Sequence, residues 1–152
     1  MKIIGVSQRL GISKFGELRA QIDTRLFNFI SKCGYVPIPI PYYDLPKKNS
    51  LRKLSIWLRS IKLSGIVLSG GDDIGKYKLR DNSENFLINY SIKKKIPVFD
   101  ICRGIQFIGS YFHVKLKPIK NHANILHIIY SNKKINTVNS NHNLSLKKYL
   151  KN

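Results

Sequence analysis

Acidic residues are scarce in this sequence. Only 8 of its 152 residues are Asp or Glu, against 27 Lys and Arg, which gives a formal net charge of +19. Such a charge suits binding to nucleic acid or to a membrane surface. However, the lysines are spread along the chain, as in a composition rich in Lys, Asn and Ile, and no zinc-finger spacing, basic zipper or single-strand-binding aromatic motif accompanies them. We interpret the charge as compositional and keep a basic nucleic-acid-binding protein as an alternative.

Cysteines and long apolar runs are scarce too. The 2 cysteines, Cys33 and Cys102, cannot form a disulfide framework. No run of about eighteen apolar residues occurs, which excludes a transmembrane helix. We therefore expect no membrane partner. The apolar stretch at residues 1–7 is too short for a signal peptide and lacks a cleavage site of small residues. We therefore expect a cytoplasmic protein.

The length and the apolar content favour one folded domain. A chain of 152 residues suits a single domain, and a hydrophobic content of 43% is enough to build a buried core. No internal repeat or low-complexity linker divides the chain. We expect one domain, or most of one, over residues 1–152.

Apolar periodicity predicts strands that alternate with helices. The expected strands are 2–7, 35–40 (at an edge of the sheet or at a strand end), 65–69 and 96–101, followed by a hairpin of 125–130 and 135–138. The expected helices are 15–32 (with Gly34 as its stop), one capped by Ser50 and running to Ile61, one from Asp81 or Ser83 to Lys93–Lys95, and 104–112. This alternation indicates an α/β protein with a largely parallel sheet that is covered on both faces.

Two loops, 69–73 and 100–104, follow strands at the carboxyl edge of the expected sheet, where ligands bind in such folds. Cys102 lies between an apolar strand and an apolar helix, which is the context of a nucleophile elbow. The helix dipole and the adjacent Arg103 would favour a thiolate, and the backbone N–H after the cysteine could face an oxyanion. The local pattern leaves open that Cys102 is a small buried apolar residue. Cys33 lies on the apolar face of a helix, so we expect it in the core.

Glycines accompany both loops. Gly70 and Gly71 allow the backbone to turn and to present N–H groups to a developing negative charge, although a pair of glycines is equally a simple tight turn. Gly104 permits close approach of the following helix to the strand. We expect the diglycine turn to lie at the same sheet edge as Cys102.

Several segments together carry a family resemblance. In chain order they are 5–9 (GVSQR), 69–74 (SGGDDI), 80–84 (RDNSE) and 97–106 (PVFDICRGIQ), followed by 138–143 (VNSNHN). This series resembles the class I glutamine amidotransferase-like superfamily, and specifically its gamma-glutamyl hydrolase branch of cysteine peptidases. The resemblance extends from residue 1 to about residue 145.

The resemblance implies a flavodoxin-like three-layer α/β/α sandwich that hydrolyses a gamma-glutamyl amide of a small-molecule substrate, with no metal and no organic cofactor. Cys102 matches the nucleophile that forms a gamma-glutamyl thioester. The backbone N–H groups of Gly71 and Arg103 match the oxyanion hole, and Gly70 shapes the turn beside it.

Further substrate-binding residues follow from the same resemblance. Gln106 matches a position that contacts the bound glutamyl group, and Ser140 and His142 lie in the segment that borders the pocket. Without the resemblance, Gln106 could equally be a helix-surface residue, and His142 would be taken for a loop histidine. His122 and His127 resemble a spaced pair in related sequences, and we expect both to be packed or solvent-facing.

The branch includes enzymes that cleave gamma-glutamyl-gamma-aminobutyrate or folate polyglutamates. Another group, from surface-polysaccharide biosynthesis, releases glutamate from a gamma-glutamyl phosphoramidate nucleotide. The compact Asn-Ser-x-His-Asn segment, with Asn143 where many relatives have a second histidine, resembles this last group.

Two departures from the family pattern bear on activity. Asp100 stands where relatives have glycine, and a carboxylate there would oppose a thiolate and crowd the elbow. The catalytic histidine and glutamate of the family lie in a His-x-Glu motif, which occurs nowhere in this sequence. We expect a truncated gene product, a fragment of a longer enzyme, or a chain in which His142 serves as the base. An inactive remnant or a glutamyl-binding module of the same fold is therefore the alternative to an active hydrolase.

Overall fold

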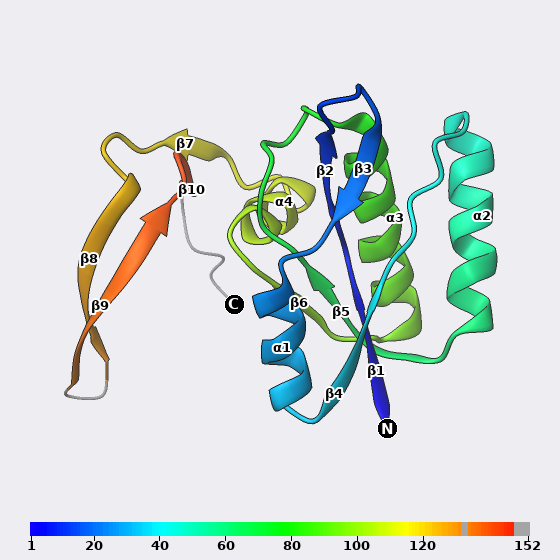
Figure 1. Cartoon of the computed structure of the whole chain (residues 1–152), viewed down its shortest axis with the longest axis horizontal. Coiled ribbons are helices and arrows are strands. Elements are labelled where there is room, and N and C mark those ends of the chain that lie inside the picture. The colour runs from blue at the N-terminus through cyan, green and yellow to red at the C-terminus, as the bar shows by residue number, and fades with distance from the viewer. Residues whose placement is uncertain (132–133, 148–152) are drawn as a thin grey trace. The chain divides into compact units, whose positions relative to one another are not determined.

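The computed structural model describes residues 1–131 and 134–147. The chain divides into two compact units, Met1–Ile105 and Gln106–Asn152. Figure 1 shows the elements of both units along the chain. No helix in the described ranges is both long and apolar enough to cross a lipid bilayer.

The first unit is built on a sheet of four parallel strands. These are β1 (Lys2–Val6), β4 (Tyr35–Pro39), β5 (Leu63–Leu68) and β6 (Val98–Asp100), in the order β4-β1-β5-β6. When these four strands are numbered in chain order, their order across the sheet is 2-1-3-4, as in the flavodoxin-like sheet. β4 lies at an edge, as expected for a strand whose prolines cannot donate to a neighbour on both sides.

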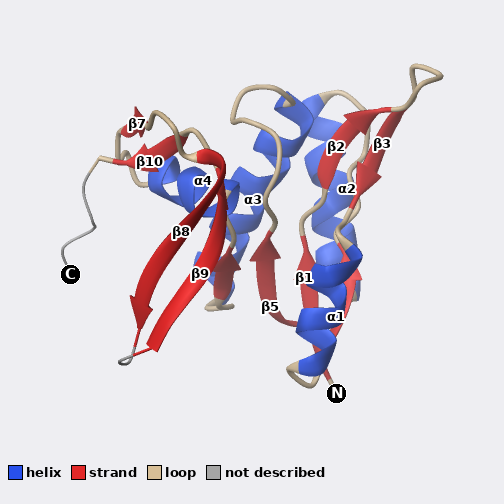
Figure 2. Ribbon diagram, turned by 60° about the vertical axis from the view of Figure 1, so that its left-hand side comes forward, coloured by secondary structure: helices blue, strands red, loops and turns tan. Residues whose placement is uncertain are grey.

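Three helices cover the two faces of this sheet: α1 (Thr24–Lys32), α2 (Lys47–Ser60) and α3 (Lys78–Lys94). On one face Ile30 of α1 packs against Val6 and Val67. Side chains alternate along a strand, so Ile66 and Leu68 of β5 lie buried on the opposite face, towards α2 and α3. Figures 1 and 2 show α1 on one side of the sheet and the other two helices on the other. The predicted three-layer α/β/α architecture is therefore confirmed.

The predicted helix 15–32 is wrong in its first half. β2 (Arg9–Ile12) and β3 (Leu18–Gln21) form an antiparallel hairpin there. The turn between them is closed by a hydrogen bond from the Ser13 N–H to the Glu17 carbonyl (2.8 Å). α1 begins only after Asp23, whose carboxylate caps it by accepting the Arg25 N–H (2.8 Å). This local capping and turn chemistry overrides the helical spacing of the apolar residues.

Two other helix starts differ from the predicted ones. α2 begins at Lys47 directly after Pro46, and Ser50 is buried inside the helix instead of capping it. α3 begins at Lys78, so that Asp81 falls in its first turn and Ser83 is buried within it. In both cases the side chain that resembled a cap lies one turn inside the helix.

Cys33 is exposed, so the prediction that it belongs to the core is wrong. It directly follows α1 as its C-cap and is followed by Gly34 in the left-handed region (φ 82°). The side chain lines an open apolar groove of about 550 Å³ together with Phe29 and Phe99, both more than half exposed. Its apolar neighbours are present, but no element of the first unit covers them.

The second unit contains most of α4 (Arg103–Tyr111) and two antiparallel pairs. The strands are β7 (Leu116–Pro118) with β10 (Leu144–Leu146), and β8 (Ala123–Ser131) with β9 (Lys134–Asn141). The β8–β9 pair confirms the predicted hairpin, whose tip at 132–133 lies outside the described residues. α4 packs closely on β10, because a methyl group built on Gly109 would lie 2.1 Å from a Leu146 methyl carbon.

Candidate functional site

Cys102 occupies the sharp turn between β6 and α4. Its φ angle is +53°, a left-handed conformation that residues other than glycine seldom adopt, and its side chain is exposed. A strained residue at a strand-to-helix turn is the hallmark of a nucleophile elbow. The structure thus presents this thiol to solvent instead of burying it in the core.

Gly104 allows the elbow to form. A methyl group at this position would lie 2.6 Å from the Leu68 carbonyl oxygen and 3.0 Å from the Asp100 Cβ. No side chain fits in that space without a shift of the backbone of β5. The prediction that Gly104 permits close approach of helix and strand is confirmed.

The diglycine turn lies beside the elbow. β5 pairs with β6, with Leu68 opposite Asp100, so the loops that follow them leave the sheet as neighbours. A methyl group on Gly70 would lie 3.4 Å from the Cβ of Cys102. Gly71 has φ 83°, and its N–H makes no hydrogen bond within residues 1–131 and 134–147. The two predicted loops therefore come together at the sheet edge.

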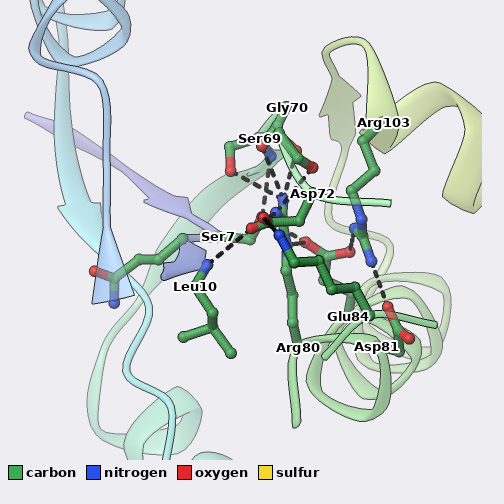
Figure 3. Close-up of polar contacts among 12 residues, drawn as sticks. Ser7, Leu10, Ser69, Gly70, Asp72, Arg80, Asp81, Glu84 and Arg103 are labelled. Carbon is green, nitrogen blue, oxygen red and sulfur yellow. Dashed lines mark hydrogen bonds and ion pairs between the residues drawn. The ribbon is translucent and has the colours of Figure 1, made fainter. Parts of the chain in front are cut away.

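The buried guanidinium of Arg80 on α3 fixes the carbonyls of this turn (Figure 3). It donates hydrogen bonds to the carbonyl oxygens of Ser69 (2.7 Å), Gly70 (3.2 Å) and Gly71 (3.2 Å). In a planar trans peptide the N–H points away from the carbonyl. Because Arg80 holds the Gly70 carbonyl, the N–H of Gly71 in the same peptide is directed away from α3.

The carboxylate of Glu84 joins this guanidinium to the other elements. It accepts hydrogen bonds from the Nε of Arg80 (2.9 Å) and from the hydroxyl of Ser7 (2.9 Å), and it also pairs with Arg103. Ser7 in turn accepts the N–H of Ser69 (3.0 Å). Figure 3 shows these buried side chains meeting between the ends of β1 and β5, α3 and the first residue of α4. A satisfied buried network of this kind holds its elements in one arrangement.

The Arg103 side chain has a different environment from the one expected. Its place next to Cys102 in the sequence predicts that its charge lies beside the thiol. Instead, the guanidinium pairs with the carboxylates of Asp81 and Glu84, and the side chain is buried. Its charge is therefore balanced by α3 and is not free to stabilise a thiolate. The structure leaves the predicted oxyanion role of its backbone N–H as a prediction.

Asp100 is partly buried at the end of β6. Burial raises the pKa of this carboxyl, because the charged form is disfavoured away from water.

The second unit brings the three predicted substrate-binding residues together. The Gln106 amide and the His142 Nδ1–H both donate to the Leu144 carbonyl oxygen, at 3.0 Å each. The buried Ser140 hydroxyl donates to the His122 carbonyl at 2.7 Å. Gln106 is itself buried, so it is not a helix-surface residue. Since a carbonyl can only accept, the Nδ1 of His142 is the donor in this contact.

Three histidines of the second unit form a cluster. The ring of His122 lies 4.2 Å from that of His127 and 4.6 Å from that of His142, measured between centroids. Burial lowers the pKa of His122, and the two neighbouring imidazoles lower it further. Within the described ranges no group of His, Cys, Asp and Glu side chains is arranged to hold a metal ion.

A pocket of about 230 Å³ opens in the first unit beside the diglycine turn. The turn itself and the end of β6 form one wall, and the β2–β3 hairpin and the start of α1 form the other. The lining residues are Arg9, Gln21, Ile22, Asp23, Leu26, Ser69, Gly70, Gly71 and Ile101.

Sequence reasoning overlooked the residues that organise this edge. Ser7, Arg80 and Glu84 lie in segments that carry the family resemblance, but the sequence indicates no role for their side chains. Arg80 and Glu84 are spaced by four residues, as in an exposed ion pair of a helix. Nothing in that spacing indicates that both side chains are fully buried.

The family model for Peptidase C26 matches residues 2–151. The chain belongs to the Peptidase C26 family. This Peptidase C26 chain is 31% identical over 155 residues to a gamma-glutamyl-CDP-amidate hydrolase from Campylobacter jejuni, a match that covers 95% of the chain and 72% of that protein. It is 29% identical over 113 residues to a gamma-glutamyl-gamma-aminobutyrate hydrolase from Escherichia coli O157:H7, covering 66% of the chain and 44% of that protein. The chain thus spans less than half the length of the second relative.

Solved structures with this fold agree with the family. One is a GMP synthase subunit from Thermoplasma acidophilum, with a TM-score of 0.63 and 21% identity, covering 97% of this chain and 67% of that one. A glutamine amidotransferase from Methylobacillus flagellatus gives a TM-score of 0.51 at 12% identity, covering 96% of this chain and 57% of that one. At these identities the likeness supports the Peptidase C26 fold and not a particular reaction.

Proposed function

We propose that this protein hydrolyses a gamma-glutamyl amide bond through a thioester on Cys102. The observation that carries the proposal is the exposed thiol at a strained strand-to-helix turn, beside a diglycine turn, in a chain of the Peptidase C26 family. The family match spans both units, which supports treating residues 1–152 as one domain.

The proposed reaction has two steps. The Cys102 thiolate attacks the gamma-carbonyl carbon, and the carbonyl electron pair moves onto oxygen, where the N–H groups of Gly71 and Arg103 stabilise it. Collapse of this intermediate breaks the C–N bond, and the departing amine takes up a proton. Water then attacks the thioester, releasing glutamate and the thiolate. Gln106, Ser140 and His142 are the proposed contacts of the glutamyl group.

The finer proposal concerns the substrate. We propose a gamma-glutamyl phosphoramidate nucleotide, cleaved in the cytoplasm during surface-polysaccharide biosynthesis. The similarity to the Campylobacter jejuni enzyme over 95% of the chain and the Asn143 of the Asn-Ser-x-His-Asn segment support this choice.

Covalent labelling tests the proposal. Incubation with the gamma-glutamyl electrophile 6-diazo-5-oxo-norleucine should add one glutamyl-ketone group at Cys102, seen by intact mass and peptide mapping. Cys102→Ala should stay unlabelled, and Cys33→Ala should label like the unmodified protein. Since Cys33 is also exposed, equal labelling of both cysteines would count against a dedicated site.

A second candidate is a glutamyl-binding module without turnover. The pairing of the Arg103 guanidinium with Asp81 and Glu84 favours it, because a charge held there does not stabilise a Cys102 thiolate. It predicts binding of gamma-glutamyl amides with no release of glutamate, either by this protein or by Cys102→Ala. Glutamate release that disappears in Cys102→Ala would reject it.

A further inference from the structure

We propose that Arg9 binds an anionic group, a carboxylate or a phosphoryl group, on the amine side of the scissile amide. The inference rests on the proposed function and names a class of leaving group for it. Three features of the first unit carry it: the place of Arg9 against the proposed oxyanion turn, its lack of a partner among the described residues, and the pocket that it lines.

Arg9 on β2 lies directly against the diglycine turn. A methyl group built on Gly71 would lie 3.2 Å from the Cδ of Arg9. The next residue, Leu10, donates its backbone N–H to the Asp72 carboxylate at 3.1 Å, as Figure 3 shows. Asp72 follows Gly71 and is itself paired with Arg80 at 3.5 Å. The hairpin that carries Arg9 is thus attached to the same turn that would hold the oxyanion.

The guanidinium of Arg9 is available to a ligand. The side chain is exposed and forms no hydrogen bond or ion pair with any residue of the described chain. The other charged group of the pocket wall, Asp23, already has a partner, because Arg25 pairs with it at 2.7 Å. That pairing holds the pKa of Asp23 at about 2, with only a small contribution from Arg9. Arg9 is therefore a cation of this pocket without a hydrogen-bond or ion-pair partner in the part of the chain that the structure describes.

The pocket suits one group of a substrate. Its volume of about 230 Å³ is smaller than the range of about 300–1,000 Å³ that is usual for whole drug-sized ligands. A planar guanidinium binds carboxylates and phosphates through two parallel hydrogen bonds, and the Gln21 amide on the same wall can donate another. Gamma-aminobutyrate and a nucleotide phosphoramidate both carry an anion on the amine side, so an arginine at this position could recognise either.

Binding to the Cys102→Ala protein tests the inference without requiring turnover. Calorimetric titration would use gamma-glutamyl-gamma-aminobutyrate, a gamma-glutamyl phosphoramidate of a cytidine nucleotide, and gamma-glutamyl ethylamide, whose amine side is uncharged. In this background Arg9→Gln should raise the Kd of both anionic ligands about tenfold, within the usual range for loss of a charge-assisted contact. The Kd of the ethylamide should change less than about twofold, since it lacks the anion. The anionic ligand with the larger loss identifies the preferred leaving group.

Arg19→Gln is the matched control, because it removes the same charge from the neighbouring strand of the hairpin but does not line the pocket. It should leave all three Kd values unchanged. Equal weakening of all three ligands by Arg9→Gln would mean that Arg9 contacts the glutamyl group, and unchanged Kd values would mean that it contacts nothing; either result overturns the inference. If no ligand binds even with Arg9 present, the proposed function itself fails. Urea unfolding of each variant would confirm that the fold is retained.

Discussion

The Nε of Arg80 and the Oε1 of Glu84 lie 2.9 Å apart on successive turns of α3, and both side chains are fully buried. The pair connects the carbonyls of the diglycine turn to the first residue of α4. The position of the two loops at the sheet edge therefore depends on an ion pair inside the protein.

Glu84→Gln should destabilise the protein by about 3 kcal/mol, because two buried guanidinium groups would lose their shared carboxylate. Urea unfolding at neutral pH would measure this. Glu17→Gln, which breaks the exposed pair with Arg19, is the control and should cost less than about 1 kcal/mol. A loss below about 1 kcal/mol for Glu84→Gln would contradict a structural role for the buried pair.

The strain at Cys102 predicts an unusual ranking of substitutions. Its φ of +53° favours glycine over any residue with a Cβ. Cys102→Gly should therefore be more stable than Cys102→Ala by about 1 kcal/mol, although both remove the thiol. Urea midpoints of the two variants, compared at equal slope, would measure the difference. An alanine variant as stable as the glycine variant would show that the turn relaxes.

Gly104→Ala should cost about 2 kcal/mol or more, since its methyl group would lie 2.6 Å from the Leu68 carbonyl oxygen. The elbow should move as the backbone yields, so labelling of Cys102 by the gamma-glutamyl electrophile should slow as well. Gly11→Ala provides the comparison, because the nearest atom to its new methyl group would be 3.7 Å away in the flexible Gln21 side chain. Similar stability of the two variants would refute the close approach.

His122 makes the second unit sensitive to acid. Its pKa is lowered in the folded state, so the unfolded chain binds the proton more tightly. The contribution of neutral His122 to the stability of the folded state is complete above the unfolded pKa of about 6.5. It is lost as the pH falls through the lower folded pKa. A proton NMR titration should give a His122 midpoint below about 6.5, and His122→Gln should remove this part of the pH dependence. A midpoint at or above that value would contradict the cluster.

Several features of this protein could be predicted from the sequence because they depend on local patterns. The apolar runs of β1 and β5, the prolines of β4 and the left-handed Gly34 each act within a few residues. The glycine at 104 and the order of strands and helices likewise indicated where a turn and a sheet edge would be. These predictions required no knowledge of distant contacts.

Other features could not be predicted because their causes are distant in the chain. The helical spacing around Leu18 gave no sign of a hairpin whose register is set by its partner strand β2. Cys33 has the apolar neighbours of a core residue, but its exposure depends on whether another element covers them. Arg103 follows Cys102 directly, yet its side chain pairs with carboxylates 19 and 22 residues away in the chain.

The sequence by itself determined the α/β alternation, the two loops at the sheet edge and the thiol between strand and helix, since hydrophobic period and glycine placement act locally. Only the tertiary structure decided that Arg80 and Glu84 are buried, that Arg103 is paired away from the thiol and that Arg9 lies against Gly71 with no ion-pair partner among the described residues. A charged side chain has the same formula whether it is solvated or buried, and its partners are set by which distant segments the fold brings beside it.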